Sequence, residues 1–407
     1  MSRLDGPQGP RRRRLGLARA FVLALSSLIS LAIVEGGLRL THAYGGQAYS
    51  VNPTGSQYKF YQFDPVLGWA NAPGMRGTYE RDEFRFPIRV NSFGMRDAEI
   101  ERAPGPKRRI VVLGDSFTWG IGVADEDRFT EQLERARGVE ALNFGVAGYA
   151  PIQYSLMIDE VLAFEPEIVV VAFCLGNDFS DNVYFERYGY YKPYAELDPS
   201  GELVIRGHPL PDIDDFGFRA RAEGFLLARI LDTAISNGFF LPGQAGLLGF
   251  RNELIYDEEG FDVEQRSLAD RAIRINEALL ARIRDAVRGA GATLVLLPVP
   301  TKCEYVESCG QGGQLRVRDT AHRVLEATAE RLGVLFVPTL DALDRSHFWE
   351  KDGHWRPSGH ARIAERLGDF LAGEGLIDGR DRLSWRGVPA IHATGSNRPM
   401  DPRPIGG

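Results

Sequence analysis

The chain has 407 residues, of which 44% are hydrophobic and 25% are charged, and its formal net charge is −7. This composition is typical of a globular protein and excludes a disordered or fibrous chain. Proteins that bind nucleic acid usually present a basic face, so the acidic balance argues against a nucleic-acid partner.

The N-terminal segment 1–44 combines a basic cluster, Arg11–Arg14, with an apolar run that extends to Val34. About 20 apolar residues span a bilayer, and a long side chain such as Arg19 can reach the headgroups. No convincing cleavage motif follows. The pattern therefore predicts an uncleaved signal anchor, a single transmembrane helix whose basic end stays in the cytoplasm. The rest of the chain would then be extracytoplasmic, in a periplasm or at the cell surface.

Segment 45–106 is rich in glycine, proline and aromatic residues. Its stretch FRFPIRVNSFGMRD alternates enough to predict short strands and a turn, and we expect this lead-in to pack on the main domain.

From residue 107 to residue 377, short apolar segments alternate with amphipathic ones. Five apolar segments predict strands: RRIVVLGDS, EALNFGVAG, EIVVVAFCLGND, ATLVLLPVP and GVLFVPTL. Helices are predicted for DRFTEQLERAR, PIQYSLMIDEVLAF, DRAIRINEALLARIRDAVRGAG, LRVRDTAHRVLEATAERLG and PSGHARIAERLGDFLA. Continuously apolar strands that alternate with helices predict a three-layer α/β domain around a five-stranded parallel sheet.

Two further segments lie outside this alternation. Residues 182–261 form an insertion, in which DPSG predicts the turn of a hairpin. Its aromatic stretch YFERYGYYKPY fits either a wall for sugar rings or a packed lid. Residues 378–407 are polar and rich in proline and glycine, so we expect a poorly ordered tail.

Residues with catalytic chemistry follow successive predicted strands. Ser116 follows the first strand, Gly148 the second, Asn177 the third, and Asp352 with His354 the last. The carboxyl ends of parallel strands meet at one edge of a sheet, where these groups would form an acyl-transfer site. Each residue alone also fits a structural role, as a helix cap or a loop glycine. Their ordered occurrence favours the site.

Four motifs carry a resemblance to a known family. GDSF, NFGVAG, LGND and DGHWRPSGH resemble, in the correct order, the four blocks of the SGNH hydrolases, the GDSL-type esterase superfamily. The resemblance covers residues 107–371 and implies a flavodoxin-like sheet and a ping-pong acyl mechanism. It also implies a nucleophile at Ser116, a base at His354 and an acid at Asp352. The oxyanion hole would comprise the Ser116 amide, the Gly148 amide and the Asn177 side chain.

The sequence departs from related patterns at two places. Phe117 and Thr118 follow the serine, where the α/β-hydrolase motif G-x-S-x-G has its second glycine. One residue separates the acid from the base, whereas the commonest family ending is Asp-x-x-His. Asp344 and His347 have that commoner spacing. We prefer His354, because the residues after it lead into a helix. Its Asp-x-His-Trp pattern also resembles SGNH members that O-acetylate exopolysaccharides.

The cysteines and remaining histidines add little chemistry. Cys303 and Cys309 would pair in an oxidising compartment or stay as loop thiols, and Cys174 fits a core position. A metal site of Asp352, His354 and His360 has no further ligand cluster to support it. We expect a structural role for His360, and no metal or other cofactor.

Three functions follow from these predictions. The first is a serine esterase that removes ester groups, O-acetyl above all, from an envelope or exported carbohydrate, with an acylated lipid as the other substrate class. The second is an O-acetyltransferase of a cell-surface polysaccharide, working beside a membrane partner that supplies acetyl groups. The third is a non-enzymatic envelope scaffold, which would not need all five site residues.

Overall fold

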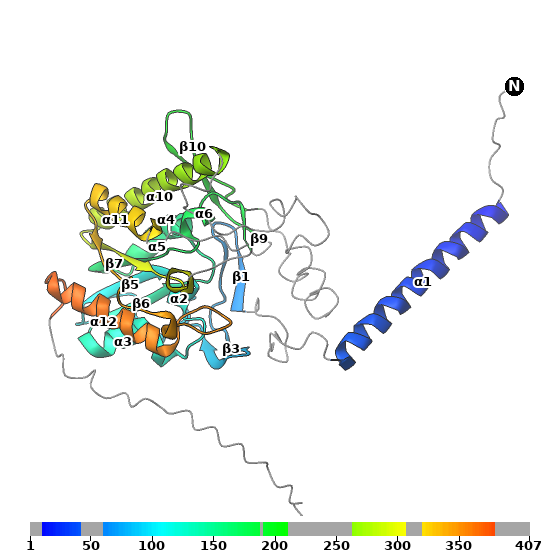
Figure 1. The fold of residues 1–407 in the computed structure, drawn as a ribbon, viewed down its shortest axis with the longest axis horizontal. Helices are drawn as coiled ribbons and strands as arrows, with labels where there is room; N and C mark the ends of the chain where they lie inside the picture. The colour runs from blue at the N-terminus through cyan, green and yellow to red at the C-terminus, as the bar shows by residue number, and fades with distance from the viewer. Residues whose placement is uncertain (1–9, 42–59, 188–189, 211–262, 307–319, 379–407) are drawn as a thin grey trace, which may run out of the picture.

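The computed structural model describes residues 10–41, 60–187, 190–210, 263–306 and 320–378 (Figure 1). The predicted tail, most of the insertion and the segment 307–319 lie outside these described residues.

A five-stranded parallel sheet forms the centre of the domain, as predicted. Its strands are β5 (Arg109–Gly114), β6 (Glu140–Gly145), β7 (Ile168–Cys174), β12 (Thr293–Val299) and β13 (Leu335–Phe336). They are arranged in the order β13-β12-β7-β5-β6. Numbered along the chain, this is the flavodoxin-like order 2-1-3-4-5, which reverses direction between β5 and β7. Ligands of such sheets bind at the carboxyl ends of the strands beside this reversal.

Helices cover both faces of the sheet, which gives the predicted three layers (Figure 1). One face carries α4 (Pro151–Leu156), α5 (Ile158–Leu162), α10 (Val263–Gly289) and α11 (Thr320–Leu332). The other face carries α3 (Phe129–Arg137) and α12 (Pro357–Gly373). Successive strand residues alternate between the two cores: Val111 packs in the first, and Val112 in the second. Burial on both sides explains why β7 is apolar throughout and why β5 is apolar after Arg109.

The helix predicted over PIQYSLMIDEVLAF is divided in two. Met157 joins α4 to α5 with φ −93° and ψ 1°, outside the helical region. Neither glycine nor proline marks this break. Residues of both halves pack in the same buried core.

The lead-in forms two antiparallel hairpins, β1 (Tyr61–Asp64) with β2 (Gly68–Asn71) and β3 (Arg76–Arg81) with β4 (Phe84–Arg89). Their aromatic side chains surround the fully buried Trp119, which belongs to the turn after β5. The indole of Trp119 donates a hydrogen bond to Asn71 Oδ1 at 3.0 Å. The lead-in thus packs directly against the segment that carries Ser116.

The described part of the insertion holds two small hairpins. They are β8 (Glu186–Arg187) with β9 (Tyr190–Tyr191), and β10 (Tyr194–Leu197) with β11 (Leu203–Arg206). The second is the hairpin predicted at DPSG. The Asp198 carboxylate closes its turn by accepting hydrogen bonds from the amides of Ser200 and Glu202.

The N-terminal segment forms the helix α1 (Pro10–Thr41). Within the described residues, no helix is both long and apolar enough to cross a bilayer, so the predicted transmembrane anchor is not supported.

Candidate active site

The nucleophile candidate lies at a tight turn from strand to helix. Strand β5 ends at Gly114, and Ser116 is the first residue of the short helix α2 (Ser116–Trp119). Asp115, not Ser116, caps this helix, because its carboxylate accepts a hydrogen bond from the Phe117 amide at 2.9 Å. A Cβ on Gly114 would lie 2.0 Å from Thr118 Oγ1, so only glycine fits this turn. Asp115 therefore caps the helix, and the Ser116 hydroxyl contacts a different residue.

That contact is a hydrogen-bonded chain of three side chains. His354 Nε2 lies 2.8 Å from Ser116 Oγ, and His354 Nδ1 is hydrogen-bonded to Asp352 Oδ1. When Nδ1–H donates to the carboxylate, Nε2 presents its lone pair to the serine hydroxyl. The Phe117 ring packs on the imidazole, with centroids 4.8 Å apart. The structure therefore joins the predicted nucleophile, base and acid in the geometry of a Ser-His-Asp triad.

A buried tryptophan fixes the loop that carries the acid and base. Trp355 is fully buried, its indole donates to the Pro300 carbonyl at 3.2 Å, and Phe117 packs against it edge-on. Pro357 then starts α12, as the sequence predicted. His354 is thus held between a buried anchor and the nucleophile's own helix.

Asp352 is almost completely buried, with its side chain 4% exposed. Burial alone would raise its pKa, but the adjacent His354 and the guanidinium of Arg81 together hold that pKa well below the usual range of an aspartate. The acid therefore stays ionised through the acidic range and remains an acceptor for the histidine.

The alternative pair of Asp344 and His347 forms a surface turn instead. Asp344 caps the short 3₁₀ helix Arg345–His347, and its amide donates to His347 Nδ1 at 3.0 Å. Its carboxylate accepts from the Ser346 amide at 2.7 Å and is well exposed. These local bonds explain the Asp-x-x-His spacing without a catalytic role.

The two further oxyanion candidates lie on the strands that flank β5. Gly148 follows β6 with φ +81°, a left-handed conformation that favours glycine. Asn177 follows β7 and precedes the short helix α6 (Asp178–Asp181). Since β6 and β7 both pair with β5, all three predicted donors share one edge of the sheet.

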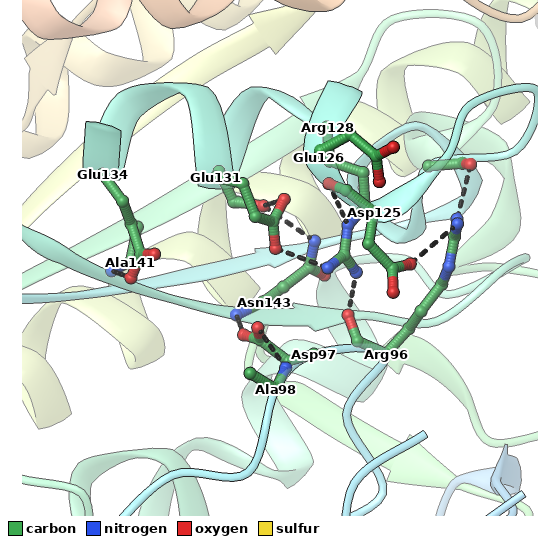
Figure 2. Close-up of polar contacts among 12 residues, drawn as sticks. Arg96, Asp97, Ala98, Asp125, Glu126, Arg128, Glu131, Glu134, Ala141 and Asn143 are labelled. Carbon is green, nitrogen blue, oxygen red and sulfur yellow. Dashed lines mark hydrogen bonds and ion pairs between the residues drawn. The ribbon is translucent and has the colours of Figure 1, made fainter. Parts of the chain in front are cut away.

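A buried arginine from the lead-in, which the sequence reasoning missed, supports the nucleophile turn (Figure 2). Arg96 donates to the carbonyls of Trp119 and Gly120 at 2.9 and 2.6 Å, at the C-terminal end of α2. It forms an ion pair with Asp125 at 3.1 Å. Burial and the neighbouring Arg128 lower the pKa of Arg96 to about 9, so the arginine remains charged at neutral pH. A side chain of the lead-in, outside the sheet domain, thus holds the turn after Ser116 through its hydrogen bonds.

Asn143, the asparagine of NFGVAG, supports the same turn from the other side. Its Nδ2 donates to the Thr118 carbonyl at 2.7 Å, and its Oδ1 accepts from the Gly145 amide at 2.9 Å. Its own amide donates to Asp97, as Figure 2 shows. The motif residue therefore joins the end of β6 to the helix that begins at Ser116.

The β3–β4 turn supplies two more residues that the sequence reasoning missed. Arg81 forms an ion pair with Asp352. The Glu83 carboxylate accepts hydrogen bonds from the amides of Glu350, Lys351 and Asp352 at 2.9, 2.7 and 2.9 Å. A carboxylate that receives three backbone amides is a strong local anchor. The only signal in the sequence was a charged Arg-Asp-Glu turn between aromatic strands, which does not reveal its distant partner.

We expect Glu83→Ala to lower kcat for an acetyl ester by up to about 10²-fold with little change in KM, because a displaced acid and base lose their alignment with the serine. Initial rates with 4-nitrophenyl acetate measure the effect. Glu80→Ala is the matched control, since Glu80 lies on the same hairpin and pairs with Arg85 near the surface. Equal rates for Glu83→Ala and the unmodified protein would contradict the role of this anchor.

His360 has a structural position, as expected. It is buried, stacks on Phe129, and its Nδ1 accepts a hydrogen bond from the Phe129 amide at 3.3 Å. Burial, together with Arg96 and Arg128, lowers its pKa to about 3, so the ring is neutral. Across the described residues, no group of three or more histidine, cysteine, aspartate and glutamate side chains is placed to hold a metal ion.

The described cysteines differ in state. Cys174 is a free, buried thiol in β7 whose pKa is raised by burial, which suits the predicted core position. Cys303 is disulfide-bonded. Its expected partner, Cys309, lies outside the described residues.

Sequence comparison finds similarity to one family model in the C-terminal part of the chain. A family model described as SGNH hydrolase-like domain, acetyltransferase AlgX, matches residues 254–391, which include Asp352 and His354 but not Ser116. Over these residues the chain is similar to SGNH hydrolase-like domains.

Particular relatives resemble only part of the chain. It is 27% identical over 146 residues to the protein named probable alginate O-acetylase AlgJ of Pseudomonas putida, covering 34% of this chain and 37% of that one. The protein of the same name in Pseudomonas syringae pv. tomato is 27% identical over 152 residues, or 36% and 38% of the two chains. This chain therefore matches little more than a third of each relative's length.

Solved structures of esterases are also similar. Axe2, an acetylxylan esterase from Geobacillus stearothermophilus, is 14% identical with a TM-score of 0.35, over 65% of this chain and 94% of that one. The psychrotrophic esterase EstA from a Pseudoalteromonas species is 12% identical with a TM-score of 0.36, over 66% and 99%.

Proposed function

We propose that this protein transfers O-acetyl groups on a polysaccharide through an acetyl-enzyme formed at Ser116. The observation that carries the proposal is the chain of hydrogen bonds from Ser116 through His354 to Asp352. It lies at the carboxyl edge of the sheet, beside the reversal in strand order where α/β folds bind ligands.

The chemistry follows from the positions of these atoms. His354 Nε2 accepts the proton of Ser116 Oγ as this oxygen attacks the acetyl carbonyl, and Asp352 stabilises the imidazolium that forms. The oxyanion of the tetrahedral intermediate receives hydrogen bonds from the amides of Ser116 and Gly148 and from the Asn177 carboxamide. Collapse expels the first alcohol, which takes the proton from His354 and leaves an acetyl ester on Ser116.

The second half of the reaction reverses these steps with a new acceptor. A hydroxyl group gives its proton to His354 and attacks the acetyl-enzyme, and Ser116 Oγ leaves with that proton. A sugar hydroxyl as acceptor gives transfer, and water gives hydrolysis. The names of the matched family and relatives, acetyltransferase and alginate O-acetylase, favour transfer. Hydrolysis of an acetylated carbohydrate is the second candidate, because the same triad performs both reactions.

Two exposed aromatic side chains on the insertion support a carbohydrate ligand. Phe185 and Tyr191 are 54% and 50% exposed, and their rings stack with centroids 6.0 Å apart. Phe185 lies on the segment that leaves α6, shortly after Asn177. Exposed aromatic faces suit the apolar faces of sugar rings. The disulfide at Cys303 supports an extracytoplasmic location, where such polymers are found.

A combined assay tests the proposal. The full chain is incubated with 4-nitrophenyl acetate, with and without unacetylated alginate oligosaccharides, beside Ser116→Ala. We expect release of 4-nitrophenol together with oligosaccharides heavier by one acetyl group by mass spectrometry, both absent in the variant. Release without acetylated sugar would select hydrolysis. If 4-nitrophenol is not released and a fluorophosphonate does not label Ser116, both enzymatic functions are rejected and the scaffold is favoured.

A further inference from the structure

The side chain of Asn177 has an unexpected partner. Asn177 stands at the N-cap position of α6, yet its side chain makes no capping bond. Its Nδ2 instead donates to Asp181 Oδ2 at 2.7 Å, four residues along the chain. A carboxamide nitrogen carries two hydrogens in one plane. The bond to Asp181 uses one hydrogen and fixes the plane, which determines the direction of the other.

Asp181 is itself deeply buried, with its side chain 2% exposed. A buried carboxylate is costly unless charged or polar groups compensate it. Arg187 forms an ion pair with the same Oδ2 atom that accepts from Asn177. Lys192 donates through its ammonium group to the main-chain carbonyl of Asp181, and to that of Pro193 at 3.1 Å. Two cations therefore hold both the side chain and the backbone of Asp181.

Both cations come from the insertion and are buried with their partner. Arg187 ends β8, and Lys192 directly follows β9. The pKa of Lys192 is lowered to about 8, because the effect of burial exceeds the opposing effect of the nearby Asp181. The lead-in packs closely against the segment that carries Lys192. At the contact, a Cβ on Gly68 would lie 2.8 Å from the Tyr191 carbonyl oxygen. Placing two cations in such an enclosed position is unfavourable unless their contacts compensate for the lost solvation.

The charges also suit the developing transition state. An ionised carboxylate next to an oxyanion hole would by itself oppose the growth of negative charge. The positive charges of Arg187 and Lys192 offset that of Asp181. The arrangement therefore orients the carboxamide through a carboxylate whose charge is offset by neighbouring cations.

We propose that Asp181 is a positioning residue for the oxyanion hole: it orients the Asn177 carboxamide toward the reacting carbonyl, and the insertion residues Arg187 and Lys192 hold it in place. This inference rests on the proposed function, and it gives the insertion a role in the chemistry of the site.

A double-mutant cycle in the full chain tests the role of Asp181. Rates of 4-nitrophenyl acetate turnover are measured for Asp181→Ala, Asn177→Ala and the double variant. Loss of one oxyanion donor costs about 10² to 10³ in kcat, and we expect Asp181→Ala to cost up to about 10² with KM little changed. The double variant should match Asn177→Ala, because Asp181 acts only through that side chain. Multiplicative losses in the double variant would overturn the proposal.

Two further variants separate positioning from folding. Asp181→Asn keeps an acceptor oxygen for Asn177 and should recover part of the lost kcat. Glu196→Ala is the matched control, since it removes a carboxylate from an exposed ion pair with Arg206 in the same insertion and should leave kcat unchanged. If the unmodified protein is active and Asp181→Ala has the same kcat, the positioning role is refuted and the proposed function stands. Absence of turnover in the wild type would instead refute the proposed function.

Discussion

Ser116→Ala and His354→Ala are each expected to lower kcat by about 10⁵- to 10⁶-fold, because residues of a triad act as one unit and removal of either one stops acylation. Ser116 Oγ and His354 Nε2 lie 2.8 Å apart, within the range for direct proton transfer. Turnover of 4-nitrophenyl acetate gives the rates, and a fluorophosphonate probe reports the nucleophile independently. Thermal unfolding should show that both variants remain folded.

His347→Ala is the control that the sequence itself supplies. Asp344 and His347 have the commoner family spacing, but their hydrogen bonds close a local surface turn. We therefore expect His347→Ala to keep most of the activity. If His347→Ala is inactive and His354→Ala remains active, His347 is the base, and the catalytic role inferred from the geometry of His354 is contradicted.

The sheet was predictable because it depends on local sequence. Strands buried on both faces are mainly apolar, and the five strands were predicted from their apolar segments. The order of the motifs then placed serine, glycine, asparagine, aspartate and histidine at one edge. Where helix α4 gives way to α5 at Met157, by contrast, no proline or glycine marks the break, and the sequence reasoning predicted one helix.

The groups that hold the site were not predictable, because their partners are distant in sequence. Arg81 and Glu83 contact the loop around Asp352, about two-thirds of the chain length away. Arg96 closes the turn after Ser116 with its guanidinium fully buried. In the sequence, each is an ordinary charged residue in a segment without a motif. Only the folded chain shows that the lead-in hairpins belong to the active site.

The membrane anchor stays a prediction, because it depends on a different kind of signal. A basic cluster beside an apolar run is a statistical signal of targeting, and it depends on segment length near a threshold. Among the described residues, no helix is both long and apolar enough to cross a bilayer. The function proposed for Ser116 does not depend on this segment, because the contacts described for the site come from the lead-in, the sheet domain and the insertion.

Asp352→Asn is expected to lower kcat by about 10⁴-fold, the size of effect seen when a triad loses its carboxylate charge but keeps its shape. The amide would no longer stabilise the imidazolium, and it favours the wrong tautomer of His354. The Glu83 contacts, which involve the backbone amide of Asp352, remain available to hold the loop. Rates with 4-nitrophenyl acetate measure the effect, and a loss below tenfold would show that Asp352 is not the acid.

The same substitution should change how stability depends on pH. His354 and Arg81 hold the pKa of Asp352 below its unfolded value, so its ionised form stabilises the folded state. This contribution is complete above the unfolded pKa, about 3.9, and is lost as the pH falls through the lowered folded pKa. The difference in Tm between wild type and Asp352→Asn should therefore be full at pH 7 and shrink in strong acid. A difference that grows in acid would contradict this assignment, because a carboxylate stabilised by its partners must lose that advantage when it is protonated.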